Sequence, residues 1–497
     1  MRREGSLREI REHREWDLLV IGGGASGLGV ALEAVSRGYR TLLVEQHDFS
    51  KGTSSRSTKL IHGGVRYLRQ GNFTLVRDAL RERGRLVRNA PHLVHDLAFV
   101  VPIYRWRDFG FYGSGLKLYD FLAGRLSLGK SRLLSRAETV RRLPGIRTRG
   151  LRGGVLYHDA QFDDSRLAIC LARSIVALGG MVANYVQVVS LLKAGRKTAG
   201  AVVKDVFSEA VYEVKARMTV NATGVFADQI RHLDDAGEPP VLAASQGTHI
   251  VLDTSFLPAS AALMVPKTED GRVLFAIPWH NRLMIGTTDV PLKEVSLEPV
   301  PLAEELDFLL RHAALYLNKA PKSSDILSMF AGIRPLVSSR QGPTSALSRD
   351  HQILVSESGL ISIVGGKWTT YRKMGEDTVN AVEKTGRMER RRGGTYDLRI
   401  HGAESGNGDE PAERLHPSFP DTRLDVLRGV REEMACTVED ILARRTRALF
   451  LDARAAMEMA PKVAAIMAEE MKCSAEWQQE QVRSFCEVAK NYLPPGE

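Results

Sequence analysis

The chain has 497 residues, of which 43% are hydrophobic and 26% charged, values typical of a globular protein with two or three domains. No apolar run reaches the roughly 20 residues that cross a bilayer, and the charged N-terminus lacks the apolar segment of a signal peptide. The net charge of +10 at pH 7 predicts an anionic partner. No helix-turn-helix, RRM or zinc pattern is found, so we expect no nucleic acid and favour small anions or an acidic membrane surface.

The first predicted unit is residues 16–46, WDLLVIGGGASGLGVALEAVSRGYRTLLVEQ. It has the order strand, glycine turn, helix, strand and acidic residue, which is typical of a dinucleotide site. Gly22 permits the tight turn, Gly24 lets the backbone approach a pyrophosphate, and Gly27 lets the helix pack on the strand. The helix N-terminus then faces the phosphates, and Glu45 is expected to accept hydrogen bonds from the ribose hydroxyls.

The hydroxyl-rich stretch TSSRSTKLIHGGVRYL, residues 53–68, follows directly. Its hydroxyl and cationic groups suit phosphate binding, and its glycines allow close approach of the backbone to a ligand. The residues predicted to hold the cofactor's phosphates and ribitol are Thr53, Ser54, Ser57 and Lys59. Gly63 and Gly64 are predicted to run against its ring system.

Two later stretches favour FAD over NAD. Residues 216–230 form a strand that ends in small residues, with Ala222 and Gly224 predicted to pass close to the cofactor. Residues 359–386 repeat the order strand, glycine, helix at Gly366. The N-terminus of that helix would favour the negative charge that develops on a reduced flavin.

Several motifs occur in the order found in FAD-dependent glycerol-3-phosphate dehydrogenases, the respiratory, quinone-reducing enzymes. Besides the two stretches above they are GTHIVL, IPWHNRLMIGTTDV, FAGIRPLV, SRDHQIL and VGGKWTTYRKM. The chain resembles this family from about Trp16 to about Lys384 and again over residues 430–456. The resemblance implies oxidation of sn-glycerol 3-phosphate to dihydroxyacetone phosphate, with hydride passing from C2 to flavin N5 and electrons passing to a membrane quinone. It implies a cytoplasmic protein held peripherally at the cytoplasmic membrane, and it leaves a homodimer open.

The substrate is a dianion, so its pocket needs fixed positive charge and hydrogen-bond donors. By resemblance, Arg66, Tyr67 and Arg349 bind the substrate and Arg334 lies nearer the reacting carbon. Lys367 is assigned to the flavin and Gly332 to cofactor binding. Thr287 either lines the substrate pocket or belongs to a turn before Asp289.

His249, in SQGTHIVL, is the candidate acceptor of the substrate's hydroxyl proton, because the pKa of histidine lies near neutrality. A single histidine on an apolar strand is more often a core residue. The sequence leaves both interpretations open. No metal site is predicted, because the spacing of the four cysteines suits neither zinc nor redox chemistry. They are Cys170, Cys436, Cys473 and Cys486.

The predicted fold is α/β: a two-dinucleotide-type FAD-binding fold with an interleaved cap of antiparallel sheet and a small C-terminal helical domain. The oxidoreductase domain spans residues 16–392. Its FAD-binding parts are expected at about 16–100, 150–230 and 340–390, and its cap at about 101–149 and 231–339. Residues 1–15 are interpreted as a charged extension that need not be ordered, 393–412 as a linker, and 413–497 as the helical domain. The family resemblance implies that this domain is several tens of residues shorter than in close relatives.

Residues 104–142 carry nine Lys or Arg against three acids, interleaved with aromatics. This composition suits an amphipathic surface on anionic lipid, or alternatively a pair of cap helices whose aromatics face the core. Three other functions compete with the main hypothesis. They are a glycerol-3-phosphate oxidase using oxygen, an amine or 2-hydroxy-acid oxidase, and a flavoprotein module without catalytic activity.

Overall fold

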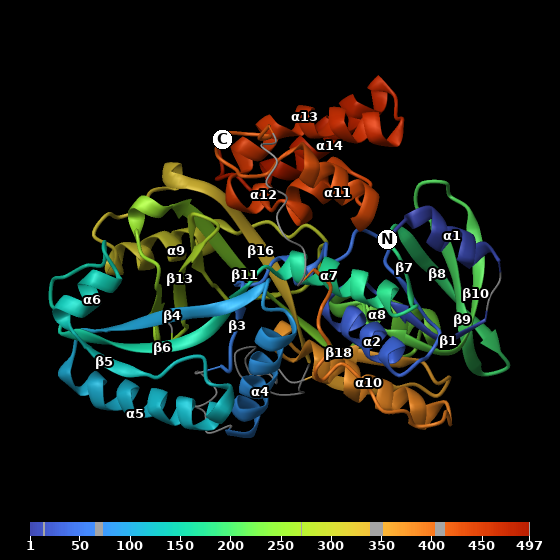
Figure 1. The fold of residues 1–497 in the computed structure, drawn as a ribbon, viewed down its shortest axis with the longest axis horizontal. Helices are drawn as coiled ribbons and strands as arrows, with labels where there is room; N and C mark the ends of the chain where they lie inside the picture. Colours follow the sequence, from blue (N-terminus) through green and yellow to red (C-terminus); the bar gives the residue numbers. More distant parts are fainter. Residues whose placement is uncertain (13–14, 65–72, 270, 338–350, 403–412, 497) are drawn as a thin grey trace.

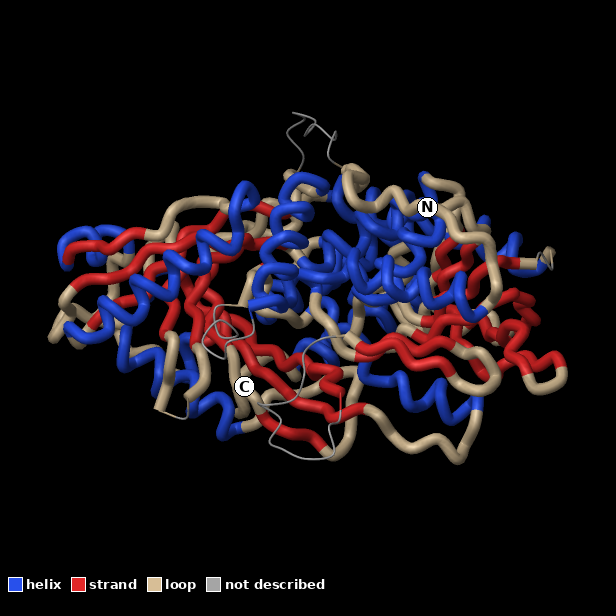
Figure 2. The backbone as a smooth tube through the Cα atoms, turned by 90° about the horizontal axis from the view of Figure 1, so that it is seen from below, coloured by secondary structure: helices blue, strands red, loops and turns tan. Residues whose placement is uncertain are grey.

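The computed structural model describes residues 1–12, 15–64, 73–269, 271–337, 351–402 and 413–496. Two sheets lie side by side, and a group of C-terminal helices sits above both (Figure 1). Helices cover the strands along much of the molecule, as Figure 2 shows from below. The α/β class predicted from the sequence is confirmed.

The first sheet has the strand order β17-β18-β10-β1-β2-β7, with β9 pairing β10 and β8 pairing β9. The four central pairs, from β18 to β7, are parallel. Its strands are β1 (Trp16–Ile21), β2 (Thr41–Val44), β7 (Met181–Ala183), β8 (Val186–Ala194), β9 (Lys197–Asp205), β10 (Val211–Asn221), β17 (Gln352–Val355) and β18 (Ile361–Val364). The helices that pack with it include α2 (Ala25–Ser36), α7 (Asp164–Ala177), α8 (Ala227–Asp234) and α10 (Tyr371–Thr385).

Strand β1 is buried on both faces because successive side chains enter different cores. Leu18 and Val20 pack in the cluster that contains the side chains of α2, α7 and α10. Leu19 and Ile21 pack in the cluster formed with β8, β9 and the N-terminal helix. Because both faces of β1 are buried, consecutive residues of the strand, from Leu18 to Ile21, are all apolar.

The second sheet has the order β15-β11-β14-β13-β12-β4-β6-β3, with β16 pairing β11 and β5 pairing β6. All its pairs are antiparallel except β12–β4, as a predominantly antiparallel cap predicts. Its strands are β3 (Leu60–Ile61), β4 (Val94–Ile103), β5 (Arg132–Ser135), β6 (Gly153–Phe162), β11 (Leu242–Asp253), β12 (Ala262–Val265), β13 (Leu274–Trp279), β14 (Arg282–Gly286), β15 (Val290–Leu292) and β16 (Ile326–Val337). Its surrounding helices include α4 (Phe73–Asn89), α5 (Trp106–Ala123), α6 (Arg136–Arg142) and α9 (Ala303–Tyr316).

Two boundaries predicted from the sequence are wrong. Strand β4, placed mostly in the first FAD-binding part, and β6, placed in the second, pair with each other over their whole lengths in the cap sheet. The chain returns to the first sheet only with α7. Local alternation of apolar residues identifies a strand, but it does not say which sheet the strand joins.

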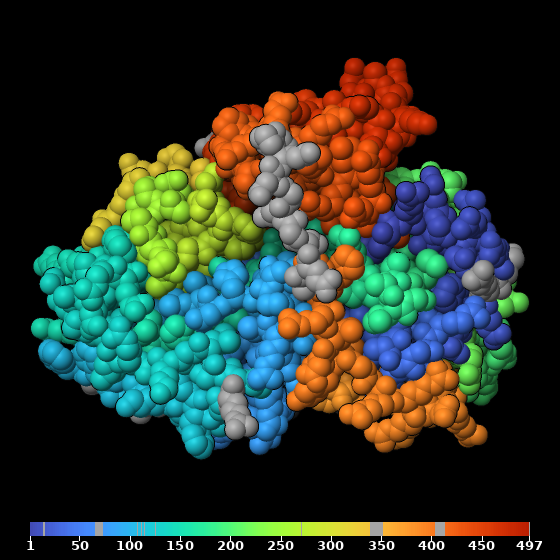
Figure 3. Space-filling view, in the orientation of Figure 1, coloured from blue at the N-terminus to red at the C-terminus, as the bar shows by residue number. Residues whose placement is uncertain are grey.

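The C-terminal region is helical, as predicted. It contains α11 (Arg423–Glu433), a π-helical turn (Asp440–Arg445), α12 (Ala448–Leu451), α13 (Ala453–Met471) and α14 (Ala475–Lys490). In the space-filling view these helices form one mass that rests on both the cap and the N-terminal region (Figure 3).

The two segments interpreted as extension and linker are packed where the structure describes them. Residues 3–11 form helix α1, whose Leu7 and Ile10 are buried against the first sheet. Thr395 and Ile400, in the segment predicted as a linker, are also buried. Residues 403–412 of that segment lie outside the described part. Among the described residues, no helix combines the length and the hydropathy needed to cross a membrane.

Helices α2 and α10 cross through a contact that only glycine permits. A Cβ on Gly375 of α10 would lie 2.3 Å from the carbonyl oxygen of Gly29 in α2. A Cβ on Gly115 of α5 would meet nothing within 4 Å. The two helical glycines thus form a matched pair of test sites.

We expect Gly375→Ala to lower the free energy of unfolding by about 1–3 kcal/mol, because backbone must move to admit the methyl group. Gly115→Ala is expected to leave it unchanged or raise it by up to about 1 kcal/mol, because alanine favours the helix. Urea denaturation followed by circular dichroism measures both. Equal effects of the two substitutions would contradict the close helix contact.

Candidate functional site

A cavity of about 340 Å³ lies where the two sheets meet, within the size range of ligand-binding pockets. Its wall includes most of the residues predicted for the cofactor and the reaction. These are Gly22, Gly24, Glu45, Thr53, Ser54, Ser57, Ala222, Gly224, His249, Gly332, Arg334, Gly366 and Lys367. Segments more than three hundred residues apart in the sequence therefore converge on one site.

The turn between β1 and α2 brings a helix N-terminus to the cavity wall. Gly24 is the N-cap of α2 and makes no side-chain cap hydrogen bond, while the N–H of Ala25 donates to the Ser54 hydroxyl at 2.9 Å. A Cβ on Gly27 would lie 1.9 Å from the carbonyl oxygen of Gly22, so the close packing requires glycine. A helix N-terminus in this setting is suited to a pyrophosphate.

Glu45 lies at the carboxyl end of β2 and faces the same turn. Its carboxylate accepts hydrogen bonds from the N–H of Gly23 at 2.6 Å and of His47 at 2.9 Å. Burial raises the pKa of Glu45, although both N–H groups oppose this. An acidic side chain at this position of the fold suits ribose hydroxyls, so the residues present fit a dinucleotide.

Antiparallel strands β11 and β16 form the opposite wall. Their register pairs Gly247 with Gly332, with His249 paired to Phe330 on one side and Ser245 to Arg334 on the other. Because side chains alternate along a strand, the glycines lie on the same face as His249 and Arg334. A Cβ on Gly247 would fall 2.1 Å from the Arg334 guanidinium. The absence of a side chain at this position therefore gives the guanidinium the space it occupies.

Arg334 is held in position by neighbours on the same sheet. Its guanidinium donates to Asp289 at 3.1 Å and to the Thr287 hydroxyl at 3.1 Å. Thr287 is not among the residues that line the cavity, so the structure places it behind Arg334. Asp289 was not singled out from the sequence, where it resembles an ordinary turn residue after GTT.

His249 is 2% exposed and its Nε2 lies 3.0 Å from the Thr58 hydroxyl. Its Nδ1 is buried without a hydrogen-bond partner among the described residues, and its ring stacks on Phe330 at 4.9 Å. Burial lowers the pKa of His249 well below its ordinary value, and Lys59 and Arg334 add to the effect. The imidazole is therefore neutral at neutral pH, the state in which it can accept a proton.

Lys59 was predicted to hold cofactor phosphates, and the structure contradicts this. Its side chain is fully buried, outside the cavity wall, and its Nζ donates to Asp164 at 2.7 Å. Ser57 lines the cavity but its hydroxyl also donates to Asp164, at 2.7 Å. Thr58, between them, contacts His249. The sequence shows the hydroxyl and cationic groups but not which side of the loop each one faces.

Gly63 also differs from its predicted place beside the flavin. Its N–H donates to the Tyr119 hydroxyl at 2.7 Å, and neither Gly63 nor Gly64 lines the cavity. The predicted substrate residues Arg66, Tyr67 and Arg349 lie outside the described residues.

The comparisons with known proteins agree with this geometry. Residues 17–372 match the family described as FAD dependent oxidoreductase, and residues 359–481 match the C-terminal domain of alpha-glycerophosphate oxidase. The fold and the cavity thus define a flavin-dependent oxidoreductase as the class of protein.

Relatives that align with nearly the whole chain identify the family more closely than the two family models do. Human mitochondrial glycerol-3-phosphate dehydrogenase is 38% identical over 548 aligned positions, covering 99% of this chain and 75% of the relative. The probable mitochondrial enzyme of Dictyostelium discoideum is 39% identical over 96% of this chain and 84% of its own length. A Bacillus halodurans glycerol-3-phosphate dehydrogenase, solved in complex with FAD, superposes with a TM-score of 0.80 at 30% identity, covering 100% of this chain and 98% of that one. The chain belongs to the FAD-dependent glycerol-3-phosphate dehydrogenase family.

The alignment with the human relative spans 548 positions, more than the 497 residues of this chain. Some positions of the relative therefore have no counterpart in this chain. The shortened C-terminal domain stays a prediction.

Glu45→Gln is expected to weaken FAD binding about tenfold to a hundredfold, because a hydrogen bond to a charged acceptor contributes about 1.5–3 kcal/mol. Because the pKa of Glu45 is raised, the wild-type advantage should fade as the pH falls through that raised pKa and the charge is lost. Titration of apo-protein with FAD at several pH values measures both effects. Glu209→Gln, an exposed change outside the cavity, is the control. A wild-type affinity for Glu45→Gln would remove Glu45 from the cofactor site.

Proposed function

We propose that the protein oxidises sn-glycerol 3-phosphate to dihydroxyacetone phosphate, with hydride passing from C2 to flavin N5, and delivers the electrons to a membrane quinone. The observation that carries this proposal is the convergence of His249, Arg334 and Lys367 on the cavity wall that also contains the β1–α2 turn. Membership of the glycerol-3-phosphate dehydrogenase family supports the choice of substrate.

The residues of the cavity suit oxidation of a secondary alcohol. When bound, FAD supplies the hydride acceptor. His249, neutral and partly unpartnered, accepts the proton of the C2 hydroxyl. Arg334 stays protonated, so it stabilises the developing alkoxide and does not act as the base. Lys367 adds positive charge at the opposite wall.

The phosphate dianion needs further cations, and these are assigned from the sequence. Arg66, Tyr67 and Arg349 remain the predicted phosphate ligands. A bidentate guanidinium matches the geometry of phosphate oxygens, and the net charge of +10 favours approach of an anion.

An oxidase that uses oxygen is the second candidate function. It is favoured by the match of residues 359–481 to the C-terminal domain of alpha-glycerophosphate oxidase. The Mycoplasma pneumoniae glycerophosphate oxidase superposes with a TM-score of 0.61 at 16% identity, which shows a shared fold alone. The electron acceptor therefore has to be tested directly.

The test is anaerobic addition of sn-glycerol 3-phosphate to the FAD-loaded protein while the flavin absorbance is recorded. We expect rapid bleaching, reversed quickly by a ubiquinone analogue and slowly by air. Rapid reversal by air would favour the oxidase. A flavin that never bleaches would reject the proposal and favour a non-catalytic module, and sn-glycerol 1-phosphate is the control for stereochemistry.

Helix α5 supports the membrane part of the proposal. Trp106 and Phe121, at its two ends, are 68% and 80% exposed, and the helical period places them within about 60° of each other. Lys117 is exposed on the same face, while Tyr119 on the other side is buried. Exposed aromatics beside basic residues suit the interface of an anionic membrane. Homodimerisation stays a prediction.

Replacing Trp106 and Phe121 together by serine is expected to weaken binding to phosphatidylglycerol vesicles at least tenfold, because each aromatic ring loses an apolar contact with the lipid. Vesicle sedimentation measures the binding, with phosphatidylcholine vesicles as the uncharged comparison. The control is Leu424→Ser on α11, which removes another exposed apolar side chain. Undiminished binding by the double variant would exclude α5 as the contact surface.

A further inference from the structure

The loop of residues 55–59, between the β1–α2–β2 unit and β3, is fixed by a buried carboxylate that does not line the cavity. Arg56, Ser57 and Thr58 of this loop form part of the cavity wall, but Asp164 does not. The Asp164 carboxylate accepts from the N–H of Ser57 at 3.1 Å, from the Ser57 hydroxyl at 2.7 Å and from Lys59 at 2.7 Å. The position of the loop therefore depends on Asp164, at the start of α7.

Arg447, which comes from the C-terminal helices, completes this arrangement. Its Nη2 donates to Asp164 at 3.0 Å and to the carbonyl oxygen of Ser55 at 2.8 Å. Its Nη1 donates to the Ser165 hydroxyl at 2.8 Å and to the carbonyl oxygen of Ala443 at 2.6 Å. The side chain is almost fully buried. One guanidinium therefore connects the C-terminal helices both to the loop, at Ser55, and to the start of α7, at Asp164 and Ser165.

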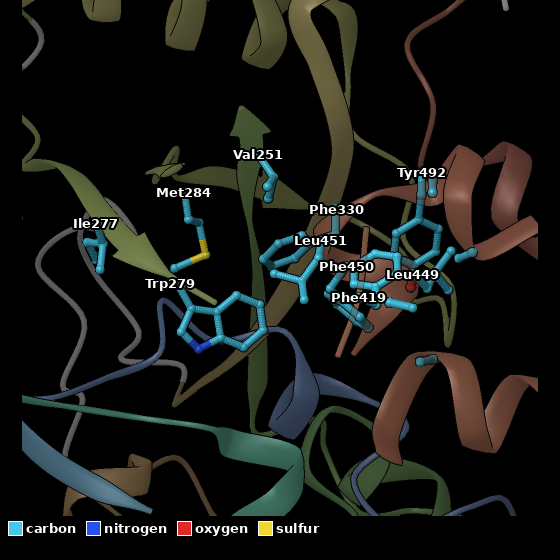
Figure 4. Packing of buried hydrophobic residues seen from close by; sticks show 14 of the residues in the cluster. Val251, Ile277, Trp279, Met284, Phe330, Phe419, Leu449, Phe450, Leu451 and Tyr492 are labelled. Carbon is cyan, nitrogen blue, oxygen red and sulfur yellow. The ribbon is translucent and has the colours of Figure 1, made fainter. Parts of the chain in front are cut away.

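Lys59 and Arg447 share Asp164 inside an apolar enclosure. The Lys59 ammonium lies 5.2–5.3 Å from the ring centres of Trp279, Phe330 and Phe450, which come from the cap sheet and from α12 (Figure 4). Burial lowers the pKa of Lys59 to about 7; Asp164 opposes this and Arg447 adds to it. Loss of Asp164 would leave two buried cations without their shared carboxylate. Loss of Arg447 leaves Lys59 and Asp164 paired but removes the hydrogen bond to Ser55.

The same loop contacts the candidate proton acceptor. Thr58 lies between the two residues that bind Asp164, and its hydroxyl is 3.0 Å from Nε2 of His249. Phe330, one of the rings around Lys59, stacks on the His249 imidazole. The orientation of His249 thus depends on contacts that the anchored loop supplies.

We propose that Arg447 is a positioning residue for the reaction: with Asp164 it fixes the loop of residues 55–59, and through Thr58 it fixes the orientation of His249 in the cavity. The C-terminal helices therefore form part of the catalytic unit although none of their side chains lines the described cavity wall. The claim that Arg447 affects the reaction rests on the function proposed above. The claim that Arg447 and Asp164 fix the loop of residues 55–59 does not depend on that function.

The first experiment compares Arg447→Lys with Arg166→Lys. Lysine at 447 keeps the charge but cannot bridge Asp164 and Ser55 as the planar guanidinium does. Arg166 also joins the cofactor-binding part to the C-terminal helices, through two hydrogen bonds to Glu433 at 2.6 and 2.7 Å, and it does not line the cavity. Titration of apo-protein with FAD should give a dissociation constant about tenfold higher for Arg447→Lys, because the loop is part of the wall, and within about twofold of wild type for Arg166→Lys.

The second experiment measures flavin reduction by sn-glycerol 3-phosphate at saturating FAD. Arg447→Lys and Thr58→Val are each expected to lower the maximal rate about tenfold while leaving KM within about threefold, because misorientation of His249 affects proton transfer more than binding. The double variant should be no slower than the slower single variant, since both changes act on one linkage. A merely structural role of Arg447 would not produce this non-additivity.

Two results would overturn the inference: an FAD dissociation constant for Arg447→Lys within twofold of wild type, or rate losses that multiply in the double variant. If Arg447→Lys does not fold, Arg447→Met replaces it, because methionine fills part of the same space and leaves Lys59 and Asp164 paired while removing the hydrogen bonds to Asp164 and Ser55. A wild-type protein that binds FAD but is not reduced by the substrate would reject the proposed function alone. The FAD titrations would still decide the role of Arg447 at the loop.

Discussion

The approach of α2 to β1 is the constraint on which the rest of the site depends. The first N–H groups of the helix can act on an anion only if the helix begins within a few residues of the strand end. That leaves no room for a side chain at Gly27, where a Cβ would lie 1.9 Å from the carbonyl oxygen of Gly22. Strand β10 also ends close to this turn, because a Cβ on Gly22 would lie 2.7 Å from the carbonyl oxygen of Ala222. The strand order β10-β1-β2 follows this geometry, because the ends of β10 and β2 must bring Ala222 and Glu45 to the same turn.

The second wall of the cavity is determined by the register of an antiparallel strand pair. Strands β11 and β16 pair with Gly247 opposite Gly332. His249 and Arg334 therefore lie on the same face of the sheet, each two residues along its own strand from the glycine and on opposite sides of the glycine pair. The register therefore gives a hollow between a potential base and a fixed cation. The cavity forms where this ladder meets the carboxyl ends of the parallel strands, which is the usual ligand position in such sheets.

Local patterns account for what could be predicted. The β1–α2–β2 unit and the turn at Gly366 depend on contacts within about thirty residues, so spacing and periodicity suffice. The end of β10 can be recognised from its small residues, although its contacts, with Ile21 and Gly22, are about two hundred positions away. Lys59 shows the limit, because its burial depends on Asp164, more than a hundred positions away. Helix α1 was missed for a related reason. Its sequence is mostly charged, and only two apolar side chains, Leu7 and Ile10, attach it to the sheet.

Buried charge also joins the C-terminal helices to the cofactor-binding part. Asp48 accepts hydrogen bonds from Arg444 at 2.6 Å and from Arg445 at 2.7 and 2.9 Å. Burial would raise the pKa of Asp48, but the two arginines hold it below its ordinary value. Replacing a complete buried ion pair by apolar groups costs little, whereas separating its partners costs several kcal/mol.

The cost of exposing such pairs applies to any motion that lifts the helices from the sheets. It adds to the loss of the apolar contacts around Phe450 and Tyr492, which pack toward the cap sheet beside Phe330 (Figure 4). Both kinds of contact lie on the side of the helical region that faces the sheets, within residues 444–492. These contacts make that side of the helical region the surface that supports the cavity loop.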